Sequence, residues 1–462
     1  MSPDSLLLRT PRRSALSVSL AVGLGFALSS SADAHADAIA NGPHPMTPHT
    51  VTTCADDDSP GSLRAIIASP NTGDGDTIDL TQLACSTITL DNATHVPSHI
   101  TVNQPSLHLL GPGSGALTID GNLHSSVLRH VGYGTLEIEG VTIANGKYIS
   151  ANQPFGGCIY SKGSVTLTNA HVENCVATGT AATDAMGGGV FSTHDLKLER
   201  SEISHSAVHG DGTGTRAYGG GAYAGGGLQA TYSTISNNVA FADLVGLGGG
   251  LAVFGDTISV TSSTIHSNEA DSIGGLYLRS STSASEITNS TISGNEAVRF
   301  EIGGLYAHGD LKLANSTIAF NRDAISPSHA GVDAGGASLT LESAILSGNS
   351  GPDGEADLFV DAATTVAGSN NLVVAATGVS MPPVDCPQLD LLADNGGPTL
   401  THAIPQTSLA IDAGSNLDSL VFDQTGNFRV VGAASDVGAV EWHSGLIPER
   451  MFAGGFDGVC DQ

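Results

Sequence analysis

Aromatic residues are scarce in this 462-residue chain: they make up 5% of it, with a single Trp. A densely packed core must therefore be filled by aliphatic side chains. Hydrophobic residues reach 40% in total, and the frequent Val and Ile favour strands. The composition predicts a packed all-β protein and argues against disorder, in spite of 59 Gly and 19 Pro.

Basic residues are also few, since 16 Lys and Arg stand against 45 Asp and Glu. Cleavage after Ala36 would remove three Arg and two Asp, leaving 13 basic and 43 acidic residues and a net charge of −30. Such a surface repels nucleic acid and anionic lipid, so no nucleic-acid partner is expected. It also disfavours polyanionic, pectin-like substrates unless calcium intervenes.

Long apolar runs are missing after the first 30 residues, so no transmembrane segment is expected in the mature chain. Near the start, Arg9, Arg12 and Arg13 precede an apolar run over 15–28, and small-residue cleavage sites follow at 32–36. This pattern predicts a signal peptide over 1–36 and therefore an exported protein.

No two of the six cysteines form a C-x-x-C pair, which argues against thiol redox chemistry and zinc fingers. In an exported chain six cysteines permit three disulfides, and 15 pairings are possible. Pairing of neighbours is the simplest of these hypotheses: Cys54–Cys85, Cys158–Cys175 and Cys386–Cys460.

A repeated sequence motif is the most prominent feature that the sequence does contain. It has two apolar residues two apart, a third apolar residue five further on, and usually Asn three residues later, as in Leu311, Leu313, Ile318 and Asn321. The mean period is 29 residues, which indicates a stacked repeat architecture. The third apolar column is Ile143, Val172, Ile203, Ile235, Ile265, Ile292, Ile318 and Leu346.

Several short strands per period, with glycine clusters and no helical periodicity, predict a right-handed parallel β-helix of the pectin-lyase-like kind. Equal positions then stack, so the Asn residues should form a hydrogen-bonded ladder at one corner, with Cys175 in the same column. The Asn column is Asn238, Asn268, Asn295, Asn321 and Asn349. The expected organisation is a signal peptide over 1–36, a flexible leader over 37–53, an N-terminal cap over 54–86, the β-helix over 87–385 and a C-terminal cap and tail over 386–462.

The sequence resembles a family of exported bacterial right-handed β-helix repeat proteins. The glycine clusters, such as Gly-Gly-Leu-Tyr at 274–277, and Asn-Ser-Thr-Ile-Ser-Gly-Asn at 289–295 look like its coils and like repeats of polymorphic outer-membrane proteins. Gly-Ser-Leu-Arg at 61–64 resembles its N-terminal cap with a Cys-Ser-Leu-Arg-Glu signature, although Cys54 stands apart from Ser62. Residues 392–441 resemble a choice-of-anchor Q-type C-terminal domain, and 450–457 a short terminal motif. The resemblance implies the fold, export and attachment at the outer surface of a bacterium, and no assigned activity.

An aromatic column accompanies the glycine clusters, and each of its rings follows an aliphatic residue. If the aliphatic residues point into the core, the rings form an outward strip that could contact sugar rings or another protein. If the rings point inward, they form a stacked core column instead. The sequence leaves both directions open for Tyr160, Phe191, Tyr223, Tyr277 and Tyr306.

Stacking also brings together one group of charged residues, predicted as a candidate calcium site: Glu269, Asp271, Glu296 and Asp323. The alternative is a solvated corner whose charges pair weakly. Apart from calcium, no cofactor is expected. No coil carries a recognised catalytic set, and fold alone does not establish an activity.

The leading hypothesis is therefore a monomeric, secreted or surface-displayed β-helix that binds polysaccharide or a surface protein along its face without catalysis. The alternative is a polysaccharide lyase or glycoside hydrolase of the pectin-lyase-like type, and a third possibility is a passive spacer.

Overall fold

The computed structural model describes residues 47–255, 257–280, 285–327 and 329–443. The predicted signal peptide, residues 37–46 of the leader, Cys460 and the terminal motif at 450–457 lie outside these described residues. None of the helices in the described part of the chain has both the length and the apolarity needed to cross a membrane.

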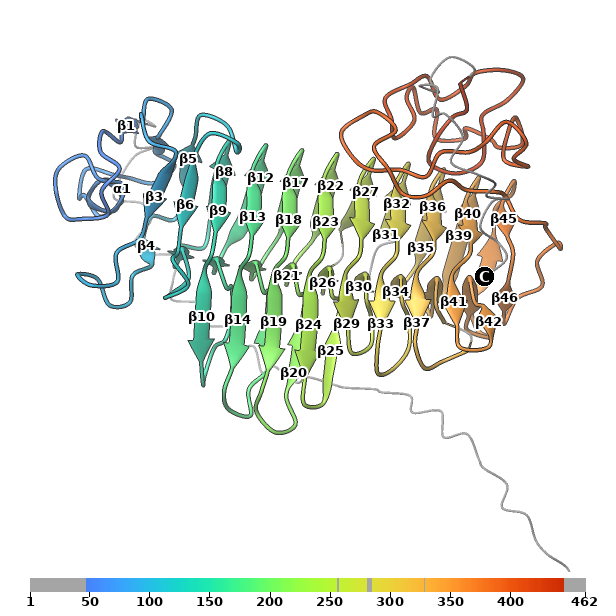
Figure 1. Ribbon diagram of the computed structural model, residues 1–462, viewed down its shortest axis with the longest axis horizontal. Coiled ribbons are helices and arrows are strands. Elements are labelled where there is room, and N and C mark those ends of the chain that lie inside the picture. The colour runs from blue at the N-terminus through green and yellow to red at the C-terminus, as the bar shows by residue number, and fades with distance from the viewer. Residues whose placement is uncertain (1–46, 256, 281–284, 328, 444–462) are drawn as a thin grey trace, which may run out of the picture. The chain divides into compact units, whose positions relative to one another are not determined.

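The chain forms a parallel β-helix, as the repeat predicts. Successive coils add one strand each to the same stacked sheets, so strands about one repeat apart in sequence lie side by side (Figure 1). Among the described strands every named pair is parallel except β41 with β42. Sheet A has 12 strands, which are β1 (Pro48–Thr50), β2 (Thr77–Asp79), β5 (Leu107–Leu110), β8 (Thr135–Glu139), β12 (Ser164–Thr168), β17 (Leu196–Glu199), β22 (Leu228–Thr231), β27 (Ile258–Thr261), β31 (Ser285–Thr288), β35 (Leu311–Ala314), β39 (Ser338–Glu342) and β44 (Thr365–Ala367).

Sheets B and C complete the three long walls. Sheet B has 11 strands, which are β3 (Thr87–Thr89), β6 (Thr118–Asp120), β9 (Thr142–Ala144), β13 (His171–Glu173), β18 (Glu202–Ser204), β23 (Thr234–Ser236), β28 (Thr264–His266), β32 (Thr291–Ser293), β36 (Thr317–Ala319), β40 (Ile345–Ser347) and β45 (Leu372–Val373). Sheet C also has 11, which are β4 (Ile100–Val102), β7 (Leu128–His130), β11 (Ile159–Ser161), β16 (Val190–Ser192), β21 (Ala222–Ala224), β26 (Leu251–Val253), β30 (Leu276–Arg279), β34 (Leu305–His308), β38 (Val332–Ala334), β43 (Leu358–Val360) and β46 (Ala376–Thr377).

Two shorter sheets lie between sheets B and C along the chain. Sheet D has nine strands, which are β10 (Lys147–Ser150), β14 (Val176–Gly179), β19 (Ala207–Gly210), β24 (Val239–Ala242), β29 (Glu269–Ala270), β33 (Glu296–Ala297), β37 (Arg322–Asp323), β41 (Ser350–Gly351) and β42 (Gly354–Glu355). Sheet E has three, which are β15 (Ala185–Met186), β20 (Arg216–Tyr218) and β25 (Val245–Leu247).

The predicted aliphatic column runs along the inside of sheet B. Ile143 pairs with Val172, and the register continues without a slip to Leu346. All eight side chains are fully buried. Equal apolar residues therefore stack at the strand spacing of about 4.8 Å and build one continuous core.

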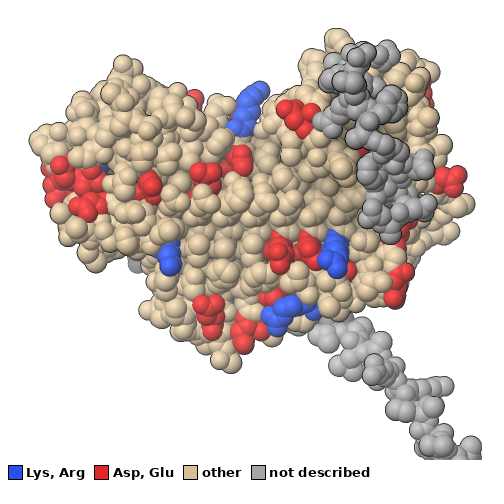
Figure 2. Space-filling view, in the orientation of Figure 1, with Lys and Arg blue, Asp and Glu red and all other residues tan. Residues whose placement is uncertain are grey.

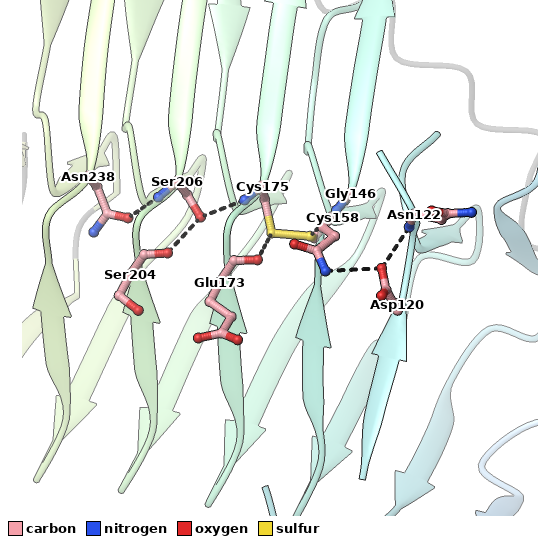
Figure 3. Close-up of a disulfide and its surroundings, with 10 residues drawn as sticks. Asp120, Asn122, Gly146, Cys158, Glu173, Cys175, Ser204, Ser206 and Asn238 are labelled. Carbon is pink, nitrogen blue, oxygen red and sulfur yellow. Dashed lines mark hydrogen bonds between the residues drawn. A yellow bond between two sulfur atoms is a disulfide. The ribbon is translucent and has the colours of Figure 1, made fainter. Parts of the chain in front are cut away.

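The predicted Asn ladder is confirmed. Each amide Nδ2 donates to the Oδ1 of the Asn in the next coil at 2.8–3.0 Å, and also to a backbone carbonyl. The ladder continues beyond the Asn residues at both ends: Ser206 and Cys175 precede it (Figure 3), and Asp357 accepts from Asn349 at its close.

Two of the predicted disulfides are present, Cys54–Cys85 and Cys158–Cys175. The second joins the glycine cluster before β11 to the start of the ladder column, as Figure 3 shows. The predicted Cys386–Cys460 pairing stays a prediction, because Cys460 is outside the described residues.

The N-terminal end of the core is closed by the helix α1 (Leu63–Ile67), whose Leu63 and Ile67 are buried. Ser62 caps this helix by accepting a hydrogen bond from the Ala65 N–H. Arg64 forms a two-pronged pair with Asp56, with both N–O distances 2.8 Å.

The loop-rich segment 386–443 packs on the outer surface of sheet B (Figure 1, red loops). Its Leu389, Ile404 and Val437 form an apolar cluster with Ala319 and Ile345. Hydrogen bonds to β28, β32 and β36 add to the contact, for example from Thr264 Oγ1 to the Leu400 carbonyl at 2.6 Å. Sheet B is therefore covered over several coils, and sheet C is left as a long outer wall.

Candidate functional site

The predicted aromatic column lies on the outer face of sheet C. The residue before each ring is buried in the solenoid core, as for Ile159 and Leu276, both 0% exposed. Because successive strand residues face opposite sides, the rings point away from the core. Tyr160 pairs in register with Phe191, and Tyr277 with Tyr306.

The rings stack on one another along this column, which we call the ring ladder. The ring centroid of Phe191 lies 5.4 Å from that of Tyr160 and 5.2 Å from that of Tyr223, and the ring planes of both pairs are within 6° of parallel. Tyr277 and Tyr306 stack in the same way at 5.6 Å and 6°. Parallel rings at this separation are offset and overlap, so each covers part of its neighbour's face.

One coil has no ring at the expected position, where Ala252 lies between Tyr223 and Tyr277. Phe254, two residues further along, supplies the missing ring. Its centroid is 5.4 Å from Tyr223 and 5.3 Å from Tyr277, and its plane is turned by 64° relative to Tyr277. The ladder is therefore continuous, and Phe254 is a member that the sequence pattern missed because it stands out of register.

The two halves of the ladder differ in exposure. Tyr160 and Phe191 are each only 7% exposed. The guanidinium of Arg129 lies 4.1 Å from the Tyr160 ring, and the Phe155 ring lies 4.7 Å from that of Phe191. The four remaining rings are partly exposed, and we call them the open half: Tyr223, Phe254, Tyr277 and Tyr306.

A row of exposed polar side chains runs beside the open half on the same outer face. Arg279 pairs with His308, and the register places Asp361 in this row two coils later. All three are exposed. An aromatic surface with a few hydrogen-bonding groups at its edge is the usual composition of a small-molecule binding site.

The coil after Tyr306 replaces the apolar pattern with titratable side chains. His-Ala-Gly-Val-Asp at 329–333 stands where Ile-Gly-Gly-Leu-Tyr stands at 302–306, so Asp333 is the strand partner of Tyr306. Nε2 of His329 lies 3.7 Å from Oδ2 of Asp333, and its ring lies 4.1 Å from that of Phe359. Sequence reasoning missed this pair, although an Asp where Tyr recurs was the signal.

Asp333 has an unusual electrostatic environment. It is 8% exposed, and no hydrogen bond reaches its carboxyl from the residues that the structure describes. Burial, and then the charges of Asp361 and Glu301, raise the pKa of Asp333 to about 7. Burial lowers the pKa of His329, so this imidazole is neutral near pH 7.

The predicted charged group on sheet D is divided between two environments. Glu269, Glu296 and Arg322 are successive strand partners, and Arg322 Nη1 lies 2.7 Å from Glu296 Oε1. Burial, and then the charge of Glu296, raise the pKa of Glu269. This pair is exposed enough to contribute little stability.

Asp271 and Asp323 are buried and bind backbone N–H groups, and Oδ1 of Asp271 also lies 3.1 Å from Nη1 of Arg299. Oδ2 of Asp271 accepts from the N–H groups of Ala242 and Gly246, both at 2.8 Å. Oδ1 of Asp323 accepts from the N–H of Ile325 at 2.8 Å. Within the described ranges, no group of three or more His, Cys, Asp or Glu side chains is placed so that it could hold a metal ion. The calcium site stays a prediction.

On the face drawn in Figure 2, acidic side chains lie at several separate places and basic ones are few. The formal net charge of the chain is −29, so its overall potential is negative. It favours association with neutral or positively charged ligands over polyanions.

No protein-family model matches the chain, and no curated protein sequence matches it. Among solved structures, the chain is similar to one described as "Crystal structure of pectate lyase Pel9A", with 14% sequence identity and a TM-score of 0.45. The match covers 87% of this chain and 98% of that chain.

Proposed function

We propose that this protein is a non-enzymatic binding protein that holds a polysaccharide against the open half of the ring ladder on sheet C. The observation that carries the proposal is the outward row of Tyr277 and Tyr306 with the exposed Arg279 and His308 beside it. Aromatic rings contact the apolar faces of sugars, while planar polar side chains bind their hydroxyl groups.

The exposure of the rings supports binding at the open half of the ladder and not at Tyr160 and Phe191. Tyr160 and Phe191 have their faces covered by Arg129, by Phe155 and by each other. A ligand cannot stack on a ring that is only 7% exposed. Tyr160 and Phe191 are accordingly assigned to stability, and Tyr223, Phe254, Tyr277 and Tyr306 to binding.

The alternative of a polysaccharide lyase or hydrolase has one observation in its favour. Two carboxyl groups, Asp333 and Asp361, lie on adjacent coils at the end of the open half, and one of them has a raised pKa. Pairs of carboxyl groups with different pKa values serve as acid and base in glycoside hydrolysis. The release of products from a bound polysaccharide separates this alternative from binding alone.

We place the binding outside the cell. Disulfides persist in oxidising compartments, and the described residues contain two, Cys54–Cys85 and Cys158–Cys175. Display at a bacterial surface, a surface-protein partner and a monomeric state belong to the same proposal.

The test is a panel of immobilised neutral, basic and acidic polysaccharides, scored for retention of the protein and for soluble products. The wild type is compared with the double variant Tyr277→Ala/Tyr306→Ala. Tyr232→Ala is the matched control, because this tyrosine lies at the corner between sheets A and B. We expect retention of the wild type on at least one polysaccharide and about a tenfold or greater loss for the double variant alone.

Failure of retention on every polysaccharide, or equal retention of wild type and double variant, overturns the proposal. Shortened or unsaturated oligosaccharides in the supernatant would replace it with the enzymatic alternative.

A further inference from the structure

The N-terminal end of the ring ladder shows how this surface holds a cation. Arg129 is the strand partner of Tyr160, and its guanidinium lies between two rings, 4.1 Å from the centroid of Tyr160 and 4.2 Å from that of Tyr148. It also donates to the Phe155 carbonyl at 3.3 Å. Aromatic faces attract cations through the negative potential of their π-systems, most strongly where water is excluded.

The C-terminal end has the complementary, acidic composition, and the cation that acts on its rings, Arg279, is exposed beside Tyr277. Tyr306 stacks on Tyr277 on one side, and the described residues provide no second ring against it. The next position of the ladder is Asp333, whose side chain is 11% exposed and accepts no hydrogen bond from the described part of the chain. Its ion-pair partner in the described part of the chain is His329, with Nε2 3.7 Å from Oδ2, and a largely buried carboxyl group is costly when ionised.

The charges around Asp333 are negative from each packed element. Asp361 on the following coil and Glu301 before β34 are exposed carboxylates that act on it electrostatically. A Cβ atom at Gly335 would lie 3.1 Å from Oδ2 of Asp361, so this carboxylate lies over the strand end next to Asp333. His329, on the fourth side, is neutral near pH 7 and supplies no compensating charge.

We propose that Tyr306 and Asp333, with Asp361 and Glu301, form a subsite for a positively charged amino group of the bound polysaccharide. The inference rests on the proposed function and specifies its ligand as an amino sugar whose nitrogen is not acetylated. The ammonium group lies against the face of Tyr306 and pairs with the Asp333 carboxylate, as Arg129 lies against Tyr160 at the other end. The acidic surface adds attraction for such a polymer at longer range.

The subsite has a predictable pH dependence. Asp333 is only half ionised near pH 7, because burial and its acidic neighbours raise its pKa to about 7. Pairing with a cation requires the ionised form. Affinity for a permanently charged ligand must therefore rise as the pH increases from 6 to 8, while affinity for a neutral ligand stays level.

The experiment compares two hexasaccharides by titration calorimetry at pH 6 and pH 8. One is the N,N,N-trimethylated chitosan hexamer, whose charge does not change with pH, and the other is the neutral N-acetylated hexamer. Asp333→Asn removes the charge with little change of shape. Glu137→Gln is the matched control, because Glu137 is an exposed carboxylate on sheet A. Thermal melts at both pH values establish that each variant is folded.

We expect the wild type to bind the trimethylated hexamer about tenfold more tightly than the acetylated one at pH 8, and less selectively at pH 6. Asp333→Asn should abolish this preference at both pH values, while Glu137→Gln should keep it.

Three results would overturn the subsite. If the wild type binds the two hexamers with equal affinity, and Asp333→Asn does the same, the subsite does not select for charge. The proposed binding of polysaccharide would still stand. Tighter binding of the peptide Gly-Arg-Gly than of the trimethylated hexamer, lost in Asp333→Asn, reassigns the subsite to a polypeptide cation. Failure of both hexamers to bind, with retention of other polysaccharides, removes amino sugars as the ligand, whereas retention of none removes the proposed function itself.

Discussion

Asp333 is the strand partner of Tyr306, so one step along the solenoid exchanges an aromatic ring for a nearly buried carboxyl group. The backbone register does not change at this step, since Val332 follows Leu305 in the core. The fold therefore accommodates the exchange, and the energetic cost comes from burial of the Asp333 carboxyl group. A residue that is costly in the folded state and faces a candidate binding surface is where function is expected.

Asp333→Asn should raise stability at pH 8 and have little effect at pH 3.5. The folded pKa of Asp333, about 7, is above the unfolded value of 3.8, so folding retains a proton that the unfolded chain releases. Stability from this group is present below pH 3.8 and is lost as the pH rises towards 7. The gain at pH 8 should be about 2–4 kcal/mol, measured by urea denaturation across this range. An equal effect of the substitution at both pH values would contradict the assignment.

Phe191→Ala should cost more stability than Tyr306→Ala. Phe191 contacts three rings, those of Phe155, Tyr160 and Tyr223, and is 7% exposed. Truncation of such a buried ring costs about 3–5 kcal/mol. Tyr306 has one ring partner and is partly exposed, so its truncation should cost about 1 kcal/mol. Comparable losses of unfolding free energy for Phe191→Ala and Tyr306→Ala, measured by chemical denaturation, would show that the two halves of the ladder contribute equally to stability.

Asn295→Ala should destabilise the solenoid by about 2–4 kcal/mol, because it breaks the ladder in the middle. Oδ1 of Asn295 accepts from both the backbone N–H and Nδ2 of Asn268, at 3.1 and 2.9 Å. Its Nδ2 donates to the Ile265 carbonyl at 3.0 Å. The substitution leaves these buried groups unpaired. Asn152→Ala, at an exposed site, is the control, and a melting temperature equally shifted in both would contradict the ladder's role.

Arg429→Met should detach the segment 386–443 from sheet B. Arg429 is 0% exposed, and its guanidinium donates to the carbonyls of Asp436 and Gly438 and to Oδ1 of Asn289. Its loss also leaves Glu441 without its buried cation, 3.3 Å away. Removing one partner of a buried pair costs about 3–5 kcal/mol.

Limited proteolysis tests the prediction for Arg429→Met. Cleavage within 386–443 should become faster in Arg429→Met, while the coils stay resistant. Arg429→Met/Glu441→Gln should recover part of the resistance, because Glu441 is then neutral. Burial already raises the pKa of Glu441 to about 8, so the single variant should also be less affected at pH 6 than at pH 9.

How far the sequence could predict the site depends on the repeat. The period placed Tyr277 and Tyr306 in one column, because equal positions of successive coils stack. It missed Phe254, which stands two residues out of register, and Asp333, which follows Tyr306 in the same column. Both departures become visible only when the coils are aligned residue by residue.

The sequence alone determined the coil register, the aliphatic core and the Asn ladder. All three follow from a repeat with a mean period of 29 residues, since stacking at the strand spacing needs no knowledge of distant contacts. The two described disulfides match the simplest of the 15 possible pairings, which the structure decided. The tertiary structure decided the direction of the rings, because strand alternation defines two faces but not which one is inside. It also decided that segment 386–443 packs on sheet B and that Asp333 lies beside Tyr306 among like charges, since both depend on loops whose paths no local pattern sets.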